Sequence, residues 1–491
     1  MTVTNSDADD PQLGAAAAGL ATVSASDSVL ESGDNETLSE NPLRSTRPFT
    51  VVSLFAGGLG LDVGLERAGG FRLLACVEKI PAFCETIRRN RDAGRIGTAE
   101  TRVYESDIGE LDPATILRDL QLESGELDLL VGGPPCQTFS TTGRRATVQD
   151  PRGTLLWQFL RFVEAMRPKF FLMENVRGLM SAALSHRPTA DRPEKGGPPL
   201  SPDERPGSVI DRFIADLSGA YRLDCFEVNA VNYGAPQLRE RALFVGNRLN
   251  RLVEFPGPTH GVPDDRVDLF SDDHTLAPFR TLRDALDGLV ETSPVMMDFS
   301  PRKKRFLSLI PPGGNWRCLP PEIAEESMGR AYHAKGGRSG WWRRLTWDLP
   351  CPTVVTMPNH ASTALCHPSE VRALTLRECA RVQEFPDEWE FCGKPTEQFA
   401  QVGNAVPVRL GQVAGIELRK HLEAERQGEV PLPHRAPQCR VVYVRSHIRT
   451  RQWFKAGTSL VWQDGQGTVS TRYSSAKTNR KVRTLTPSKH A

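Results

Sequence analysis

The chain has 491 residues, of which 39% are hydrophobic and 25% are charged, as is usual for soluble globular proteins. At about 150 residues per domain this length allows two to four domains, and it excludes a peptide or a disulfide-held mini-domain. The 61 basic and 60 acidic side chains leave a net charge of +1, so bulk charge points to no class of partner.

The first 48 residues are acidic and contain no aromatic side chain, so they could scarcely bury enough apolar surface to fold. We predict a disordered leader over 1–48. From Thr50 onward, short apolar runs alternate with helical patterns: VVSLFAGG, LLACVE, LDLLVGG, FFLMENV and ALFVGN. This alternation indicates parallel strands joined by helical crossovers. Residues 49–247 are therefore predicted to form an α/β domain with a doubly wound, mostly parallel sheet.

The first strand runs into a glycine-rich turn and then a helix. Gly57, Gly58 and Gly60 let the backbone turn tightly and bring amide groups close to a ligand, although an ordinary strand–helix turn has the same pattern. The next strand ends at Glu78, which could accept hydrogen bonds from ribose hydroxyls. Asp107 follows a third apolar run and could bond to an adenine amino group. The turn lacks the G-x-G-x-x-G spacing of dinucleotide enzymes, so S-adenosylmethionine fits better than NAD.

A fourth strand, in LDLLVGGPPCQTFS, leads to a cysteine at the carboxyl edge of the sheet. The two prolines restrict the loop and fix the direction of the Cys136 thiol, which indicates a nucleophile. A buried structural cysteine is the alternative. The strand FFLMENV brings Glu174 to the same edge, where Cys136 and Glu174 could reach opposite parts of one small ring. The alternative for Glu174 is an acid that stabilises a helix N-terminus.

The segment VNYGAPQLRERALFVGN places Gln237, Arg239 and Arg241 two residues apart, so in an extended chain all three project from one face. Two cations there suit a phosphate or an electron-rich base edge. An exposed edge strand with solvated charges is the alternative.

The remaining segments suggest further divisions of the chain. Residues 187–208 are rich in Pro, Gly and charge, which predicts a mobile surface insert. Residues 248–371 lose the strand–helix rhythm and are predicted to form a second, less regular domain. The helical pattern returns over 372–425, and a basic tail follows over 426–491. The basic and planar side chains of the second domain that could face DNA are Lys303, Lys304, Arg305, Arg338, Arg343, Arg344, Trp341 and Trp342. They could equally be solvated charges and core tryptophans.

Nine motifs follow one another in the order found in the DNA (cytosine-5) methyltransferases, and the chain resembles this family over most of residues 50–248 and 370–416. The motifs are FAGGLG, VEK, SDI, GPPCQTFS, DPRGTLLWQFLRFV, ENVRGL, QLRER, RALTLRECARVQEFPD and QVGNAVP. The resemblance implies a Rossmann-like methyltransferase fold with a smaller target-recognition domain at 248–371. It also implies a helix around Arg377 and Glu378 that braces the join between the domains.

The resemblance also implies a reaction, in which Cys136 attacks carbon 6 of cytosine and Glu174 bonds to ring nitrogen 3. Arg239, with Gln237 and Arg241, would contact the base, and carbon 5 would take a methyl group from S-adenosylmethionine. The cofactor residues that it implies are Phe55, Gly57, Gly58, Gly60, Glu78, Asp107, Ile108, Pro134, Asn404 and Val406. The family often has an acidic or aromatic residue directly after the ribose-binding Glu, where this chain has Lys79.

The expected partner is duplex DNA, methylated by a monomer in a restriction–modification system whose endonuclease is encoded separately. Methylation of transfer RNA and a catalytically silent DNA-binding regulator remain alternatives. No segment approaches the roughly 20 apolar residues that span a bilayer, and the N-terminus is acidic where a secretory signal is basic. We therefore expect a cytoplasmic protein with no membrane partner. The ten cysteines form no Cys-x-x-Cys pair, so no metal site or disulfide framework is expected.

Overall fold

The chain divides into two units, Met1–Thr46, which lies outside the described residues, and Arg47–Ala491. The computed structural model describes residues 47–135, 155–217, 219–261, 276–333 and 340–429, and the backbone of 439–444 and 480–485. The predicted leader lies almost wholly outside the described residues.

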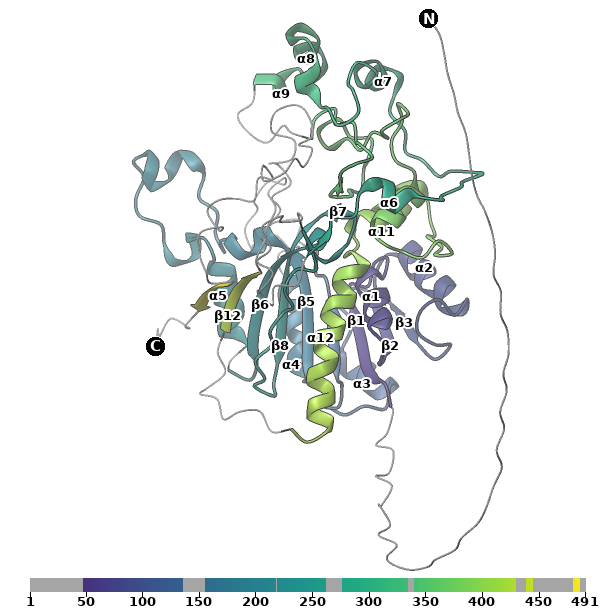
Figure 1. Cartoon of the computed structure of the whole chain (residues 1–491). Helices are drawn as coiled ribbons and strands as arrows, with labels where there is room; N and C mark the ends of the chain where they lie inside the picture. The colour runs from purple at the N-terminus through teal and green to yellow at the C-terminus, as the bar shows by residue number, and fades with distance from the viewer. Residues whose placement is uncertain are drawn as a thin grey trace, which may run out of the picture. The chain divides into compact units, whose positions relative to one another are not determined.

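A nine-stranded sheet forms the centre of the second unit (Figure 1), in the order β13-β12-β6-β8-β5-β4-β1-β2-β3. Its strands are β1 (Phe49–Leu54), β2 (Phe71–Glu78), β3 (Arg102–Glu105), β4 (Leu129–Gly132), β5 (Phe170–Val176), β6 (Arg222–Asn229), β8 (Glu240–Asn247), β12 (Cys439–Val444) and β13 (Arg480–Leu485). Pairs β1–β2, β2–β3, β1–β4, β4–β5 and β6–β12 are parallel. The predicted α/β class with a doubly wound, mostly parallel sheet is confirmed.

One strand departs from the predicted direction. β8, which contains ALFVGN, runs antiparallel to both β5 and β6, so the expectation of a parallel strand there is wrong. The physical reason is the length of the connection: β6 ends at Asn229 and β8 begins at Glu240, which leaves too few residues for a helical crossover. The reversal brings the start of β8 to the edge of the sheet where β5 ends.

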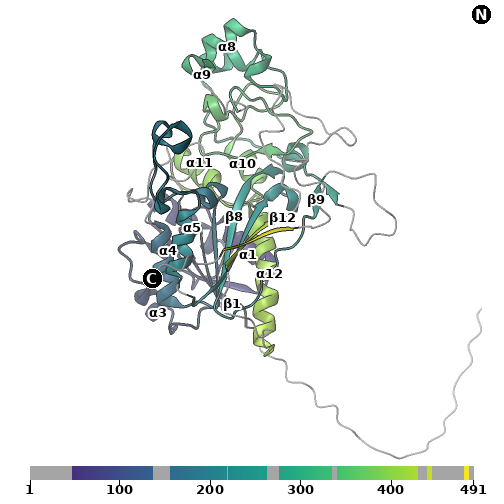
Figure 2. The ribbon, with the colours of Figure 1, turned by 90° about the vertical axis from the view of Figure 1, so that its left-hand side faces the viewer.

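Helices cover both faces of the sheet (Figure 2). The α-helices of the described residues are α1 (Gly60–Ala68), α2 (Pro81–Asp92), α3 (Pro113–Asp119), α4 (Leu155–Met166), α5 (Ser208–Asp216), α6 (Leu282–Leu286), α7 (Pro301–Leu307), α8 (Pro321–Met328), α9 (Arg330–His333), α10 (Leu376–Val382), α11 (Pro395–Asn404) and α12 (Val408–Arg426). Two short strand pairs complete the fold, β7 (Gln237–Leu238) with β11 (Cys351–Pro352) and β9 (His260–Gly261) with β10 (Ala277–Pro278). Within the described ranges, no helix has both the length and the apolar character needed to cross a bilayer.

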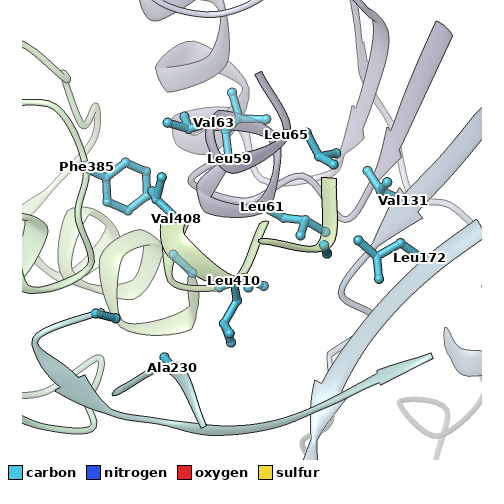
Figure 3. Close-up of a cluster of buried hydrophobic side chains, with 14 of the residues drawn as sticks. Leu59, Leu61, Val63, Leu65, Val131, Leu172, Ala230, Phe385, Val408 and Leu410 are labelled. Carbon is cyan, nitrogen blue, oxygen red and sulfur yellow. The ribbon is translucent and has the colours of Figure 1, made fainter. Parts of the chain in front are cut away.

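The main apolar core joins the first helix to the last one. Leu61 and Leu65 of α1 lie close to Leu410 of α12 in the buried cluster shown in Figure 3, with Val131 and Leu172 of the sheet beside them. The backbones of α1 and α12 approach closely because glycines face one another, and a Cβ at position 64 of α1 would lie 2.6 Å from two backbone atoms of α12. A second cluster covers the other face of the sheet through α4 and α5.

Part of the region between β8 and α10 has its own small core. Phe299, Phe306 and Trp342 are buried with other side chains between 299 and 373 in a separate apolar cluster. Other side chains of the region, such as Phe255 and Leu282, pack against the main core. The segment predicted as a tail contributes two strands to the sheet, because β12 pairs with β6 and β13 pairs with β12.

Candidate active site

A cavity of about 1350 Å³ lies where the parallel strands end. Residues at or just after the ends of β1, β2, β3, β4 and β5 line it, together with the start of β8, residues 352–356 and the turn between α11 and α12. β1 has β2 on one side and β4 on the other, so the order of the sheet reverses beside the cavity. Ligands bind at such a switch point in open α/β sheets.

The turn after β1 forms one wall of the cavity. Its backbone is left-handed at Phe55, Gly57 and Leu59, with φ angles of 54°, 54° and 66°. At Gly60, where α1 begins, a Cβ would collide with the carbonyl oxygen of Val406. Glycine at position 60 therefore lets the α11–α12 turn reach this end of the sheet.

Two carboxylates stand at neighbouring strand ends in the same cavity. Glu78 is buried, its Oε2 accepts a hydrogen bond from the Gly57 amide at 3.0 Å, and its Oε1 accepts from the Lys79 and Ile80 amides at 2.9 and 3.0 Å. Asp107 is partly exposed, with Oδ2 3.5 Å from Lys79 Nζ. These bonds fix the Glu78 carboxylate and leave Oε2 a lone pair for a ligand.

The loop after β4 leads toward the predicted nucleophile. Pro134 is buried, and its carbonyl oxygen accepts a hydrogen bond from Asn175 Nδ2 at 3.2 Å. A Cβ at Gly133 would lie 3.3 Å from Glu174 Oε2, so the loop passes directly beside this carboxylate. Cys136 itself lies outside the described residues.

Glu174 forms a buried ion pair with Arg241, and both side chains line the cavity. Each side chain is only 10% exposed. Glu174 belongs to β5 and Arg241 to β8, and the antiparallel pairing of these strands places Arg241 opposite Val176, the last residue of β5. Water screens this pair little, so the guanidinium holds the carboxylate in place at the cavity wall.

Arg239 also reaches the cavity, but it is held by two other segments of the chain. Its guanidinium donates to the carbonyl oxygens of Val354 at 2.8 Å and Gly403 at 2.9 Å. Burial, together with the charge of Arg241, holds the pKa of Arg239 well below its usual value. Arg239, which lies between β7 and β8, therefore joins these strands to the residues that follow β11 and to α11.

Gln237 does not line the cavity. Its Nε2 donates to Gln383 Oε1 at 2.8 Å, and its Oε1 accepts from the Val354 amide at 2.8 Å. Gln383 in turn donates to the carbonyl oxygens of Val402 and Ala405. Gln237 thus bonds to segments that surround the cavity, whereas Arg239 and Arg241 line it.

The predicted cofactor residues do come together. Those that line the cavity are Phe55, Gly57, Gly58, Gly60, Glu78, Asp107, Ile108, Pro134, Asn404 and Val406. Asn404 and Val406 come from the far end of the described chain and lie at the turn between α11 and α12.

The model of the family described as C-5 cytosine-specific DNA methylase matches residues 49–190 and 204–420. The chain belongs to this family. It is 36% identical over 390 residues to the type II methyltransferase M.PspPI of Psychrobacter sp. (strain TA137), an alignment that covers 78% of this chain and 82% of the relative. It is 34% identical over 388 residues to the type II methyltransferase M.Sau96I of Staphylococcus aureus, with 79% and 80% covered.

The fold is also similar to that of a solved structure. A crystal structure of an E. coli prophage protein described as a DNA modification methyltransferase superposes with a TM-score of 0.50 and 24% identity. The superposition covers 76% of this chain and 99% of the other. At this identity the likeness concerns the fold alone.

Several residues that line the cavity of this DNA methylase were not predicted to do so. They are Ser53, Asp62, Arg343, Thr353, Thr356 and Gln401. Asp62 had a signal in the sequence, because it is an acid between Leu61 and Val63 in the first turn of the helix that follows the glycine-rich turn. Thr353 and Gln401 had none, since the packing of distant segments brings them to the cavity.

The basic side chains proposed to face DNA mostly have partners within the methylase. Lys304 pairs with Asp298, and Arg305 pairs with Glu326 at 2.9 Å. Arg343 is buried, and burial lowers its pKa to about 10. Trp342 is 1% exposed and belongs to the small core, and Arg338 lies outside the described residues.

No group of three or more His, Cys, Asp or Glu side chains in the described part of the methylase is placed to hold a metal ion. The cavity is lined instead by glycines, apolar side chains, four arginines and several carboxylates.

Proposed function

We propose that this DNA methylase transfers a methyl group from S-adenosylmethionine to carbon 5 of a cytosine that is swung out of duplex DNA. A temporary bond would join Cys136 to carbon 6 of the ring. The observation that carries the proposal is the buried Glu174–Arg241 pair, which lies beside the loop leading to Cys136 and lines the same cavity as Glu78.

The residues of the cavity fit S-adenosylmethionine. Glu78 Oε2 would accept a hydrogen bond from the ribose, and Asp107 one from the adenine amino group, while Phe55 and Ile108 offer apolar surface to the adenine. Glycine at position 60 lets the turn that carries Asn404 and Val406 pack against the turn after β1, so that both turns line the cavity. When bound, the cofactor supplies a methyl group made electrophilic by a positively charged sulfur.

The chain must first make carbon 5 of cytosine nucleophilic. The Cys136 thiolate would add to carbon 6 while Glu174 holds a proton at ring nitrogen 3, so that the electron pair of the carbon 5–carbon 6 double bond becomes available at carbon 5. Arg241 keeps Glu174 in place during this step. Once carbon 5 carries the methyl group, loss of its proton returns the electron pair to the ring and expels the Cys136 thiolate.

The second substrate must reach this cavity as a single base. Carbon 6 is inaccessible to a thiol inside a duplex, so the cytosine has to leave the helix at a cost of a few kcal/mol. Residues 248–371 would supply the compensating contacts and read the target sequence. Strands β12 and β13 tie the basic segment 426–491 to the sheet, where its charges could add affinity for DNA phosphates.

A biological role follows from the relatives. Those at 34–36% identity are type II methyltransferases, which supports a role as the modification enzyme of a type II restriction–modification system. The partner would be an endonuclease, encoded separately, that cuts the same DNA sequence unless it is methylated. We expect the methylase to act as a monomer.

The test is transfer of a labelled methyl group from S-adenosylmethionine to duplex DNA by the full chain. Label should appear at carbon 5 of cytosine, and Cys136→Ala should abolish it. A duplex that carries 5-fluorocytosine at the target should become covalently joined to position 136, because the fluorine cannot leave as a proton does. Label on transfer RNA and never on DNA would overturn the proposal, as would an active enzyme that never forms the adduct.

A further inference from the structure

Asp62 is a buried acid at the wall of the cavity that the reaction above does not use. It lies in the first turn of α1, is 3% exposed and lines the cavity. The Ser53 side chain of β1 and the backbone amide of Asp62 itself bond to its carboxyl group, but Oδ1 has no hydrogen-bond partner among the residues that the structure describes. A buried carboxylate oxygen without a partner is unfavourable, so a missing ligand group is the natural explanation.

The order of the strands indicates which part of the cofactor lies beside Asp62. Asp107 follows β3, Glu78 ends β2, Asp62 stands at the junction of β1 and α1, and Pro134 and Glu174 belong to β4 and β5. Neighbouring strands are about 4.8 Å apart. If adenine is at β3, ribose at β2 and the target base at β4 and β5, as proposed above, the amino-acid end of the cofactor lies over β1.

The amino-acid end carries one carboxylate and one ammonium group. The first turn of α1 has no side chain capping it, so its backbone N–H groups suit the carboxylate. Asp62 would repel that carboxylate and attract the ammonium. Lys79, which also lines the cavity, pairs with Asp107.

We propose that the Asp62 carboxylate binds the ammonium group of S-adenosylmethionine. The inference rests on the proposed use of this cofactor. Asp62 is then a specificity-determining residue, because it separates cofactors with a free amino acid from adenosine compounds that lack one.

The ionisation of Asp62 is coupled to this binding. Burial raises the pKa of Asp62 to about 7, with Glu66 on the same helix adding to the shift and the Ser53 bond opposing it. Cys76 of β2 is the other titratable group in electrostatic contact with Asp62, and its own pKa is raised well above the usual value, so it is uncharged. α12, which packs against α1, presents glycine backbone there. Because an ammonium ion selects the ionised carboxylate, binding near pH 7 should release part of a proton.

The experiment measures binding by titration calorimetry of the full chain with two probes, S-adenosylhomocysteine and 5′-methylthioadenosine. The second probe keeps the adenosine and sulfur but has no amino acid. Asp62→Asn keeps the shape of the side chain and removes its charge. We expect it to weaken S-adenosylhomocysteine between about ten- and a hundred-fold and methylthioadenosine less than about two-fold.

The number of protons released on binding distinguishes direct contact with the ligand from a structural role, because a structural role of Asp62 would not change it. For the wild type at pH 7, the heat of S-adenosylhomocysteine binding should depend on the ionisation enthalpy of the buffer, with about half a proton released. This release should disappear in Asp62→Asn. The matched control is Glu66→Gln, which removes a partly buried acid one turn further along α1 that does not line the cavity and accepts a hydrogen bond from the Gly97 amide. It should change neither affinity by more than about two-fold.

The possible results distinguish a failure of the role given to Asp62 from a failure of the cofactor proposal. If the wild type binds S-adenosylhomocysteine and Asp62→Asn binds it equally well, or loses both probes equally, the role given to Asp62 is wrong while the proposed function stands. If the wild type binds neither probe, the cofactor proposal itself is wrong. Thermal unfolding of both variants shows whether a loss of affinity comes from a loss of structure.

Discussion

Replacing Asp62 by Asn should make the methylase more stable at alkaline pH, because the substitution removes a charge that the fold buries. Burial raises the pKa of this carboxyl from 3.8 to about 7. A group whose pKa is higher in the folded than in the unfolded chain stabilises the fold below pH 3.8, and this contribution is lost as the pH rises through 7. At about 1.4 kcal/mol per pH unit, the loss amounts to about 4 kcal/mol in the free energy of unfolding.

The assay is urea denaturation of the wild type and Asp62→Asn without cofactor, from pH 5.5 to 8.5. Asn does not ionise, and the other titrating groups are the same in both proteins, so the difference in unfolding free energy isolates Asp62. That difference should shift in favour of the variant by about 2 kcal/mol between pH 5.5 and 7 and then level off. A difference that stays constant with pH, or shifts the other way, would refute the reasoning, because the carboxyl would then not be buried in the way described.

Three further substitutions test the packing and the chemistry. Gly64→Ala should lower the free energy of unfolding, measured in urea, by about 1–3 kcal/mol, because the new Cβ would crowd the backbone around Val408. Gly257→Ala is the control: position 257 has open space around it, so the free energy of unfolding should change by less than about 0.5 kcal/mol. Glu174→Gln should slow labelled methyl transfer by about 10²–10⁴-fold, while the affinity for S-adenosylhomocysteine stays within about two-fold. Equal losses of transfer rate and of affinity would contradict the role of Glu174 in the reaction. Gln237→Ala should cost about 1–3 kcal/mol in the same urea assay, because a buried backbone amide loses its acceptor, and an unchanged midpoint would count against that bond.

Much of the cofactor end of the site could be predicted because local sequence determines it. β1 is buried along its whole length, so it appears as a continuous apolar run, and the glycines that follow it mark the turn directly. Glu78 bonds to the amide of Gly57 and to the amides of the two residues after it, so its place depends on a strand end and the adjacent turn. Features that depend on residues close together in the chain can be predicted from the sequence pattern.

The remaining parts of the site depend on contacts between distant segments. Gln237 was grouped with Arg239 and Arg241 because the three alternate along an extended chain, yet its partner Gln383 lies 146 residues away. The direction of β8 was wrong for a related reason, since apolar runs identify strands but not their orientation. The short connection between β6 and β8 did indicate an antiparallel strand, because a parallel neighbour needs a longer connection.

The buried charges explain why the site must be assembled from both ends of the described chain. Arg239 is costly to bury, and the carbonyl oxygens of Val354 and Gly403, together with the charge of Glu174, partly compensate this cost. Gly403 belongs to α11, whose following turn packs on Gly60 beside Asp62. The same closing segment therefore satisfies the Arg239 guanidinium and seals the cavity wall beside Asp62. Stability and ligand binding are thus coupled through one turn, and a change in that turn should disturb both.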